Sequence, residues 1–297
     1  MSRILLTGVS GQLGHVLQTA LAPLGEVHAV SRAEMDLADA SSIQARLDQW
    51  QPAIIINPAA YTAVDRAESE EAQAMAVNAH APAAMAHWAA RHEALLMHYS
   101  TDYVFDGQLD RPYREEDATA PQSAYGRSKC RGEEAIRASG CRHLILRTSW
   151  VFGAHGGNFL KTMLRLGAER EQLRIVADQF GAPTSTALIA EVSAAMLQQA
   201  IAAADSLPLG TYHLTAQGRT SWCDYARFIF AEARLRGAPL MVREVEGIPA
   251  SAYPLPAPRP ANSSLDCHKL MQDYRLTLPD WQAGVRQVLD QLLPSRR

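Results

Sequence analysis

A tyrosine and a lysine four residues apart, Tyr125 and Lys129, have the residue types and the spacing to protonate an oxygen. Residues four apart lie on the same face of a helix, so the phenol and the ammonium would be neighbours. Reduction of a carbonyl needs a hydride on carbon and an acid near the developing alkoxide. A free phenol has a pKa of about 10, and a cation within ~4–6 Å lowers such a value by ~1–3 units. The pair therefore predicts a proton donor, Tyr125, tuned by Lys129, which can also hydrogen-bond a ribose hydroxyl of a dinucleotide.

Two hydroxyl side chains, Ser100 and Thr101, follow an apolar strand pattern at residues 95–99. In an open α/β sheet, ligands gather at the carboxyl ends of the strands. A hydroxyl at this place can donate to the substrate oxygen beside the phenol and stabilise the charge that develops there. Both residues meet this requirement, and either could instead only cap a turn.

Three glycines, Gly8, Gly11 and Gly14, lie between the first predicted strand and the first predicted helix. At such a junction glycine permits a tight turn, a close approach of the backbone to a pyrophosphate, and close packing of helix on strand. The N-terminus of the helix then offers free N–H groups to the phosphates. The G-x-x-G-x-x-G spacing is typical of short-chain dehydrogenases and predicts a dinucleotide site.

The choice of nicotinamide cofactor depends on the end of the second predicted strand. Many NAD sites have an acidic residue there that binds the ribose hydroxyls. This chain has Arg32 instead, and a guanidinium suits a 2′-phosphate. The sequence therefore favours NADPH, while Glu34 and Asp36 leave NADH open, and Arg32 could also be only a solvated surface charge.

The elements that must position these residues alternate between short apolar runs and helical patterns, which is typical of βαβ units and a parallel sheet. Strands are predicted at residues 4–6, 27–30, 53–56, 95–99 and 143–147. A long helix is predicted over residues 70–91, with Ser69 as its N-cap, and another over 123–138. Residues 102–122 are too polar for a core and predict a loop at the active site. The expected fold is a doubly wound α/β sheet of the Rossmann type.

Beyond about residue 155 the pattern weakens. Helices are predicted at residues 159–169, 188–203, 221–236 and 281–292, with strands at 173–176 and 212–214 and a proline-rich stretch at 248–260. We expect residues 1–155 to form the dinucleotide-binding domain, and residues 156–297 to form mainly a smaller substrate-binding lobe, with some segments returning to the sheet.

Composition limits the classes of partner. The 28 basic and 31 acidic residues are mixed along the 297-residue chain and give a net charge of −3, so nothing favours nucleic acid. No apolar run is long enough for a membrane span, and no leader peptide is evident. The four cysteines are widely spaced, which predicts free thiols in a reducing compartment and a cytoplasmic location. The histidines lack metal-ligand spacing, so we expect no metal site, and no G-x-S-x-G elbow supports a hydrolase.

Taken together, several segments resemble the dTDP-4-dehydrorhamnose reductases, a family of extended short-chain dehydrogenases. The resemblance runs in order along nearly the whole chain. Its segments are the glycine turn at 8–14, NPAAYTAVD at 57–65 with Ala67-Glu68, YSTDYVFDG at 99–107, YGRSK at 125–129, RTSWVFG at 147–153, DQFGAPT at 178–184 and RPANSSL at 259–265. The last three are specific to this family rather than to short-chain reductases at large.

The resemblance implies reduction of the 4-keto group of dTDP-4-dehydro-L-rhamnose to give dTDP-L-rhamnose. It implies that the catalytic set is Thr101, Tyr125 and Lys129, which resolves the choice between Thr101 and Ser100. It also implies that the dinucleotide is lined by Gly11, Gln12, Leu13, Ala60, Tyr61 and Thr62, with Asp36 and Leu37 on its adenine side. The sugar nucleotide would contact Thr101, Asp102 and Trp150, with Arg259 and Asn262 as helpers from the smaller lobe.

One departure from the family concerns assembly. Some members carry a glutamate, linked to a magnesium-dependent dimer, where this chain has His15-Val16, so the sequence does not favour a metal-bridged dimer and leaves a homodimer of another kind open. Two alternatives to the reductase stay open. One is a reductase or epimerase of another nucleotide sugar, and the other is a non-catalytic regulatory subunit of the same fold, which could dispense with the tyrosine and the lysine.

Overall fold

The computed structural model describes residues 2–202 and 208–293. Its centre is a six-stranded parallel sheet in the order β10-β5-β4-β3-β1-β2. The strands are β1 (Ser2–Leu6), β2 (Gly25–Ala29), β3 (Ile54–Asn57), β4 (Leu95–Thr101), β5 (Arg142–Thr148) and β10 (Gly210–His213). The strand order reverses at β1, which lies between β2 and β3, and this reversal marks the place where open α/β sheets bind ligands.

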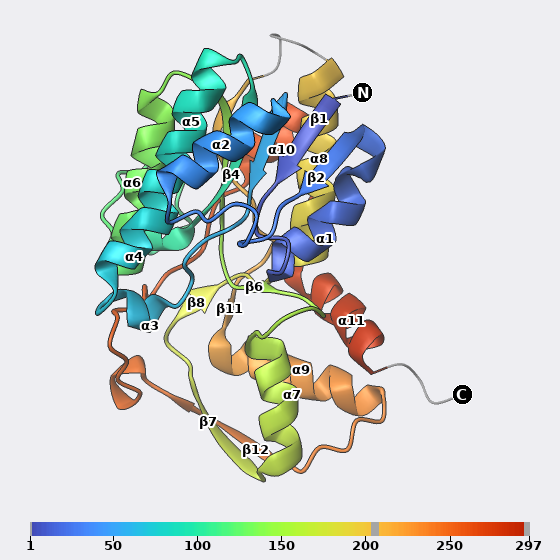
Figure 1. Ribbon diagram of the computed structural model, residues 1–297. Coiled ribbons are helices and arrows are strands. Elements are labelled where there is room, and N and C mark those ends of the chain that lie inside the picture. The colour runs from blue at the N-terminus through green and yellow to red at the C-terminus, as the bar shows by residue number, and fades with distance from the viewer. Residues whose placement is uncertain (1, 203–207, 294–297) are drawn as a thin grey trace.

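Helices cover both faces of the sheet, as the long apolar runs predict (Figure 1). On one face α1 (Gln12–Leu21) packs against α8 (Thr186–Ala202). On the other face α5 (Ala81–Arg91) packs between α2 (Ala40–Trp50) and α6 (Ala124–Ala138). Alternate residues of β1 enter the two cores, since Ile4 and Leu6 belong to one apolar cluster and Leu5 to the other. The predicted doubly wound fold is confirmed.

The helix predicted over residues 70–91 is not continuous. The chain forms α3 (Val64–Ala67), then α4 (Glu71–Met75), a π-helical turn at Ala76–His80, and α5. Ser69 does not cap α4, because its hydroxyl donates to the carbonyl oxygen of Arg66. The π-helical turn adds a residue to the helical repeat, and such turns are frequent at functional sites.

The loop at residues 102–122 is more buried than its polarity predicts. After a 3₁₀ turn at Asp102–Val104, the side chains of Val104, Phe105 and Tyr113 form a small third core with Cys130 and Leu265. The prediction that this loop is wholly outside the core was wrong, because its few apolar residues are brought together by a distant C-terminal segment.

A smaller lobe lies below the carboxyl ends of the sheet strands in Figure 1. It contains α7 (Phe159–Glu169) and α9 (Trp222–Leu235), and a parallel pair formed by β7 (Gln172–Val176) and β12 (Glu244–Ile248). Short elements complete the chain: β6 (Val151–Phe152), β8 (Phe180–Gly181), β9 (Thr184–Ser185), β11 (Thr220–Ser221), α10 (His268–Tyr274) and α11 (Trp281–Leu292). Within the described ranges, no helix has the length and apolarity to cross a membrane.

Candidate active site

The glycine turn forms a tight connection between β1 and α1. Gly8 has a φ of +61°, a conformation that favours glycine, and a Cβ atom there would lie 2.9 Å from the backbone of Ala59. A Cβ atom on Gly14 would lie 2.1 Å from the carbonyl oxygen of Gly8, so helix and turn pack too closely for any side chain. Gly11 is the N-cap of α1 and provides no side-chain cap, which leaves the first N–H groups of the helix for a ligand.

Gln12 and Leu13 open α1, as the predicted dinucleotide site requires. Both are partly buried, and the Gln12 amide oxygen accepts a hydrogen bond from the side chain of Asn158, the N-cap residue of α7, at 2.9 Å. The glycine turn is therefore tied to the start of the smaller lobe. These features fit a pyrophosphate: uncapped N–H groups at the start of a helix, in a turn that only glycine lets pack so closely.

The segment after β3 lies against the same turn. Ala60, Tyr61 and Thr62 begin three residues after the end of β3, and the neighbouring Ala59 is the residue that Gly8 approaches. The backbone of Tyr61 is held at both its N–H and its carbonyl by the side chain of Asn78, at 2.8 and 3.0 Å. The predicted cofactor residues after β1 and after β3 thus meet at the point where the strand order reverses.

Arg32 lies at the end of β2 with a side chain that is 79% exposed, 3.7 Å from the Asp36 carboxylate. Glu34 is engaged elsewhere, since its carboxylate accepts hydrogen bonds from the N–H and the hydroxyl of Ser31. That engagement lowers the pKa of Glu34. Leu37 packs against the apolar core on the α2 side of the sheet. Arg32 is therefore an exposed cation at this strand end, in a solvent-exposed pair with Asp36, that can meet an anionic group.

Tyr125 and Lys129 lie on α6, which begins after its N-cap Ser123, as predicted. The Lys129 side chain is 1% exposed, and its Nζ lies 2.6 Å from the Tyr99 carbonyl oxygen and 3.0 Å from His98 Nε2. Burial lowers the pKa of Lys129 to about 8, against an opposing effect of the Glu133 carboxylate.

The pKa of Tyr125 departs from the prediction. Burial raises it, and the Asp102 carboxylate adds to that effect, while a hydrogen bond with Thr101 acts in the opposite direction. The prediction that Lys129 lowers this pKa was wrong for the structure described here. The ammonium is directed at Tyr99 and His98 instead, and burial penalises the phenolate.

Of the two hydroxyls at the end of β4, the structure brings Thr101 to Tyr125. Thr101 donates to the Asp102 carboxylate at 2.9 Å and hydrogen-bonds the phenol. The hydroxyl of Ser100 faces Glu133 on the opposite side of the strand. Asp102 is 4% exposed, and burial raises its pKa to about 6, partly offset by the hydroxyls of Ser263 and Thr101.

Trp150 follows β5 at the same edge of the sheet and has a φ of +48°, which is strained for a bulky residue. Strain of this kind clusters at functional sites. The ring stacks on Trp222 of the smaller lobe at a centroid distance of 3.6 Å, and Gly181 leaves room for it, because a Cβ atom there would lie 2.7 Å from the indole. The indole therefore forms a rigid aromatic wall.

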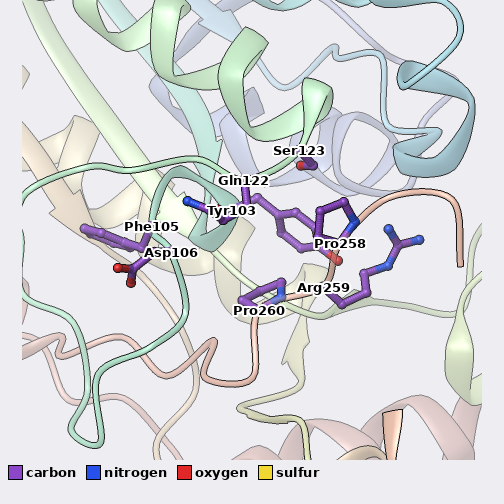
Figure 2. A pocket seen from close by; sticks show the side chains of 8 residues that line it. All are labelled: Tyr103, Phe105, Asp106, Gln122, Ser123, Pro258, Arg259 and Pro260. Carbon is purple, nitrogen blue, oxygen red and sulfur yellow. The ribbon is translucent and has the colours of Figure 1, made fainter. Parts of the chain in front are cut away.

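Arg259 lines a cavity of about 130 Å³ beside the ring of Tyr103, which in turn packs edge-on against Tyr125 at 5.5 Å. Figure 2 shows the Tyr103 ring enclosed by Gln122, Pro258 and Pro260. The Arg259 guanidinium pairs with Asp65 at 2.8 Å. The predicted helper residue is thus close to the site, but with its charge already matched by a carboxylate.

Asn262, the other helper that the resemblance implies, hydrogen-bonds within the chain. Its amide nitrogen donates to the carbonyl oxygens of Leu109 and Arg111, at 2.9 and 2.8 Å, and its amide oxygen accepts from the N–H of Ser264. With its hydrogen-bonding groups used in this way, we expect Asn262 to shape the loop beside the site rather than to touch a substrate.

Comparison with known proteins finds relatives that match nearly the whole chain. A family model described as the RmlD substrate binding domain matches residues 1–293. The dTDP-4-dehydrorhamnose reductase of Escherichia coli (strain K12) is 46% identical over 297 residues, covering 98% of each chain. That of Burkholderia thailandensis is 46% identical over 295 residues, covering 98% of this chain and 99% of the relative. The chain belongs to the dTDP-4-dehydrorhamnose reductase family.

A solved member of the reductase family has the same architecture. The enzyme from Bacillus anthracis, in complex with NADP, superimposes with a TM-score of 0.88 at 34% identity, covering 98% of this chain and 99% of that one. The family and fold predicted from the sequence are therefore both confirmed.

Sequence reasoning missed three residues of this reductase site. Asn78, in the π-helical turn, also donates to Ser128 on α6 at 3.0 Å and so joins the cofactor segment to the catalytic helix. Trp222 supports Trp150. His98 contacts Lys129. Only Asn78 had a possible signal, a buried polar residue inside a helical pattern, since the other two contacts join distant segments.

His15 and Val16 lie where the resemblance implies a glutamate in some members. The ring of His15 stacks on that of His155 at a centroid distance of 4.1 Å. Across residues 2–202 and 208–293, no group of three or more histidine, cysteine or acidic side chains is arranged to hold a metal ion.

Proposed function

We propose that this protein catalyses the NADPH-dependent reduction of the 4-keto group of dTDP-4-dehydro-L-rhamnose to dTDP-L-rhamnose. The observation that carries the proposal is the meeting of Thr101, Tyr125 and the buried Lys129 at the edge of the sheet where the glycine turn lies, in a chain of this family. The curated relatives bear the name of this reaction, and a solved relative is in complex with NADP.

Different residues are assigned to different parts of the dinucleotide. We assign the backbone of Gly8, Gly11 and Gly14, with Gln12 and Leu13, to the pyrophosphate, and Ala60, Tyr61 and Thr62 to the rest of the dinucleotide. Arg32 would meet a 2′-phosphate, with Asp36 and Leu37 near the adenine, and NADH stays possible because few contacts fix this end. When bound, the dihydronicotinamide supplies the hydride.

The protein groups supply the proton. In the proposed mechanism Tyr125 gives its phenolic proton to the sugar oxygen, and the Thr101 hydroxyl turns from the Asp102 carboxylate to donate a hydrogen bond to the same oxygen. Burial raises the pKa of this phenol and keeps it protonated at neutral pH, and the developing alkoxide is a strong enough base to take the proton. Lys129 has one N–H left beside its contacts with Tyr99 and His98, and we assign that N–H to a ribose hydroxyl of the dinucleotide, so that the lysine holds the cofactor beside Tyr125. Asp102 and Trp150 would orient the sugar nucleotide, with Arg259 at the far side.

The proposal extends to organisation and location. We propose that residues 1–155 hold the dinucleotide and that residues 156–297 mainly hold the sugar nucleotide, with β10 completing the sheet. All four cysteines are buried free thiols, which supports a reducing, cytoplasmic setting. A homodimer belongs to the proposal as well, and light scattering would test it.

The decisive experiment follows NADPH oxidation by its absorbance when dTDP-4-dehydro-L-rhamnose is added to purified protein. We expect turnover, with dTDP-L-rhamnose as the product by mass spectrometry and NMR. Protein purified with tightly bound oxidised cofactor, and active without added NADPH, would favour an epimerase. Binding of the sugar nucleotide without turnover would favour a regulatory subunit.

A further inference from the structure

A chain of buried polar side chains crosses the sheet behind the catalytic lysine. The Thr7 hydroxyl lies 2.7 Å from Asn57 Oδ1, Asn57 Nδ2 lies 3.1 Å from His98 Nδ1, and His98 Nε2 lies 3.0 Å from Lys129 Nζ. Thr7 directly follows β1, and the other three residues lie in β3, β4 and α6. Thr7, Asn57, His98 and Lys129 are 2%, 0%, 0% and 1% exposed. Buried polar groups of this kind are retained only where each one has a partner.

The imidazole of His98 is neutral in this setting. Burial lowers its pKa well below 6.5, and the charge of Lys129 adds to that effect, while a hydrogen bond with the Asn57 backbone acts in the opposite direction. A neutral imidazole has one N–H and one acceptor nitrogen, so only one of its two neighbours can donate to it. The hydrogen bond at Nδ1 therefore decides whether Nε2 accepts from Lys129 or donates to it.

Two arrangements of the chain give Nε2 of His98 opposite roles. In the first, Thr7 donates to Asn57, Asn57 donates to Nδ1, and Nε2–H donates to an uncharged Lys129 amine. In the second, the Asn57 amide is turned over, Nδ1–H donates to its oxygen, and Nε2 accepts from the Lys129 ammonium. The second arrangement holds two N–H groups of the ammonium, at His98 and at the Tyr99 carbonyl, and leaves the third free.

We propose that His98 is a positioning residue for the catalytic lysine, and that the Asn57–Thr7 pair behind it sets the balance between the charged and uncharged forms of Lys129. The proposal rests on the reductase function proposed above, in which the charged lysine, with three N–H groups, is the form that holds the cofactor beside Tyr125. It adds to that function that residues of neighbouring strands, which do not touch the substrate, influence whether Lys129 is protonated.

Other charged and titratable groups near Lys129 are few. Glu133, one helical turn further along α6, favours the charged lysine but is itself paired with Arg147 of β5 at 2.6 Å. Tyr125 lies on the same helix, and the groups from β1 and β3 are the uncharged Thr7 and Asn57. His98 is thus the group on the sheet side whose hydrogen-bonding state can change.

Three variants test the proposal through the pH dependence of kcat/KM, which reports groups of the free enzyme. Loss of the Lys129 proton should lower kcat/KM on the basic side of the profile. His98→Leu removes the acceptor from the ammonium, so this basic limb should move to lower pH by about one unit. His98→Gln keeps an acceptor near the place of Nε2 and should leave the limb close to its wild-type position.

Asn57→Asp should move the basic limb of the kcat/KM profile in the opposite direction, to higher pH. A carboxylate can only accept from Nδ1–H and from Thr7, so Nε2 must accept and the charged lysine is favoured, which shifts the limb to higher pH by about one unit. Opposite shifts are what a merely structural role would not produce. The dissociation constant for NADPH, measured by fluorescence across the same pH range, should follow the same order of variants and provides a readout without turnover.

His213→Gln is the matched control, because His213 is equally buried but contacts Tyr113 and Arg147 rather than Lys129. It should lower stability without moving the limb. Unshifted limbs in the Leu and Asp variants, with normal wild-type turnover, would overturn the role of His98. An inactive wild-type enzyme would instead remove the proposed function. If His98→Leu does not fold, the shift in Asn57→Asp decides alone.

Discussion

Two sides of the candidate site are built in different ways. On the glycine-turn side, residues 8–14 and 57–62, the position of each group follows from the backbone: strand ends, a positive φ at Gly8 and a helix N-terminus. On the C-terminal side, residues 257–265 and the stacked Trp150 and Trp222, positions depend on contacts between distant segments, such as Arg259 with Asp65. The first kind of site is fixed by local sequence, and the second only by the finished fold.

The largest effect should come from the residue between the two sides. Tyr125→Phe removes the proton donor and leaves the packing of the ring nearly unchanged, so turnover should fall by ~10²–10⁴-fold. NADPH affinity should stay close to that of the wild type. Steady-state kinetics and cofactor titration measure the two quantities separately.

Tyr274→Phe provides the control, since it also removes a buried hydroxyl, one that donates to the Pro208 carbonyl away from the site. It should lower stability and leave turnover intact. Retained turnover in Tyr125→Phe would show that another group donates the proton.

The glycine-turn side should be sensitive to a single methyl group. Gly14→Ala places a Cβ atom 2.1 Å from the Gly8 carbonyl oxygen, so the turn must shift away from α1. Overpacking of this kind costs ~1–3 kcal/mol, which should raise the dissociation constant for NADPH about tenfold or more. Gly157→Ala, where a Cβ atom meets nothing within 4 Å, is the matched control. Equal affinities in the two variants would argue against a phosphate site at this turn.

The contrast between the sides also explains what the sequence could predict. Strand and helix periodicity placed the sheet, and α7 and α11 have the predicted bounds. Gly8, Gly14, Tyr125 and Lys129 lie where local rules put them, because each is set by a turn or by one helical repeat. The π-helical turn was not predicted, since its cause is a tertiary contact: the Asn78 carbonyl lies against Gly132 of α6 so closely that a Cβ atom there would be 2.2 Å away.

Contacts between residues far apart in the sequence could not be predicted, for the same reason. The side chain of Asn262 reaches carbonyl groups more than 150 residues earlier, and no local pattern marks such a pairing. The pKa of Tyr125 was also wrongly predicted, because helical spacing gives the neighbour of a group but not its burial or the direction of the ammonium.

Substitution of Arg32 tests whether the cofactor contacts of the glycine-turn side extend to the end of β2. Arg32→Ala should raise the KM for NADPH about tenfold and change that for NADH little, because only the former has a 2′-phosphate. The effect is smaller than for a buried pair, since the side chain is 79% exposed. Arg165→Ala, an exposed arginine paired with Glu169 on α7, is the control for loss of surface charge. An equal change for both cofactors would remove Arg32 from the site.

The smallest effect is expected where the two sides of the site adjoin. There the Asp102 side chain, just after β4, hydrogen-bonds with Ser263 of the C-terminal side. Burial raises the pKa of Asp102 to about 6, so the folded protein binds this proton more tightly than the unfolded chain does. Stability should therefore fall as pH rises from about 4 to about 6. Asp102→Asn removes this penalty and should raise the Tm by a few degrees at about pH 8, but not at about pH 4.5.

Asp106→Asn is the comparison variant for Asp102→Asn, because the hydrogen bond from Tyr113 lowers the pKa of Asp106, whereas burial raises that of Asp102. A carboxylate with a lowered pKa stabilises the fold above its unfolded pKa, so this variant should lower the Tm at about pH 8. Thermal unfolding of both variants at the two pH values measures the difference. If the two substitutions changed the Tm in the same direction, the burial of Asp102 between the sheet edge and the C-terminal segment would not be what raises its pKa.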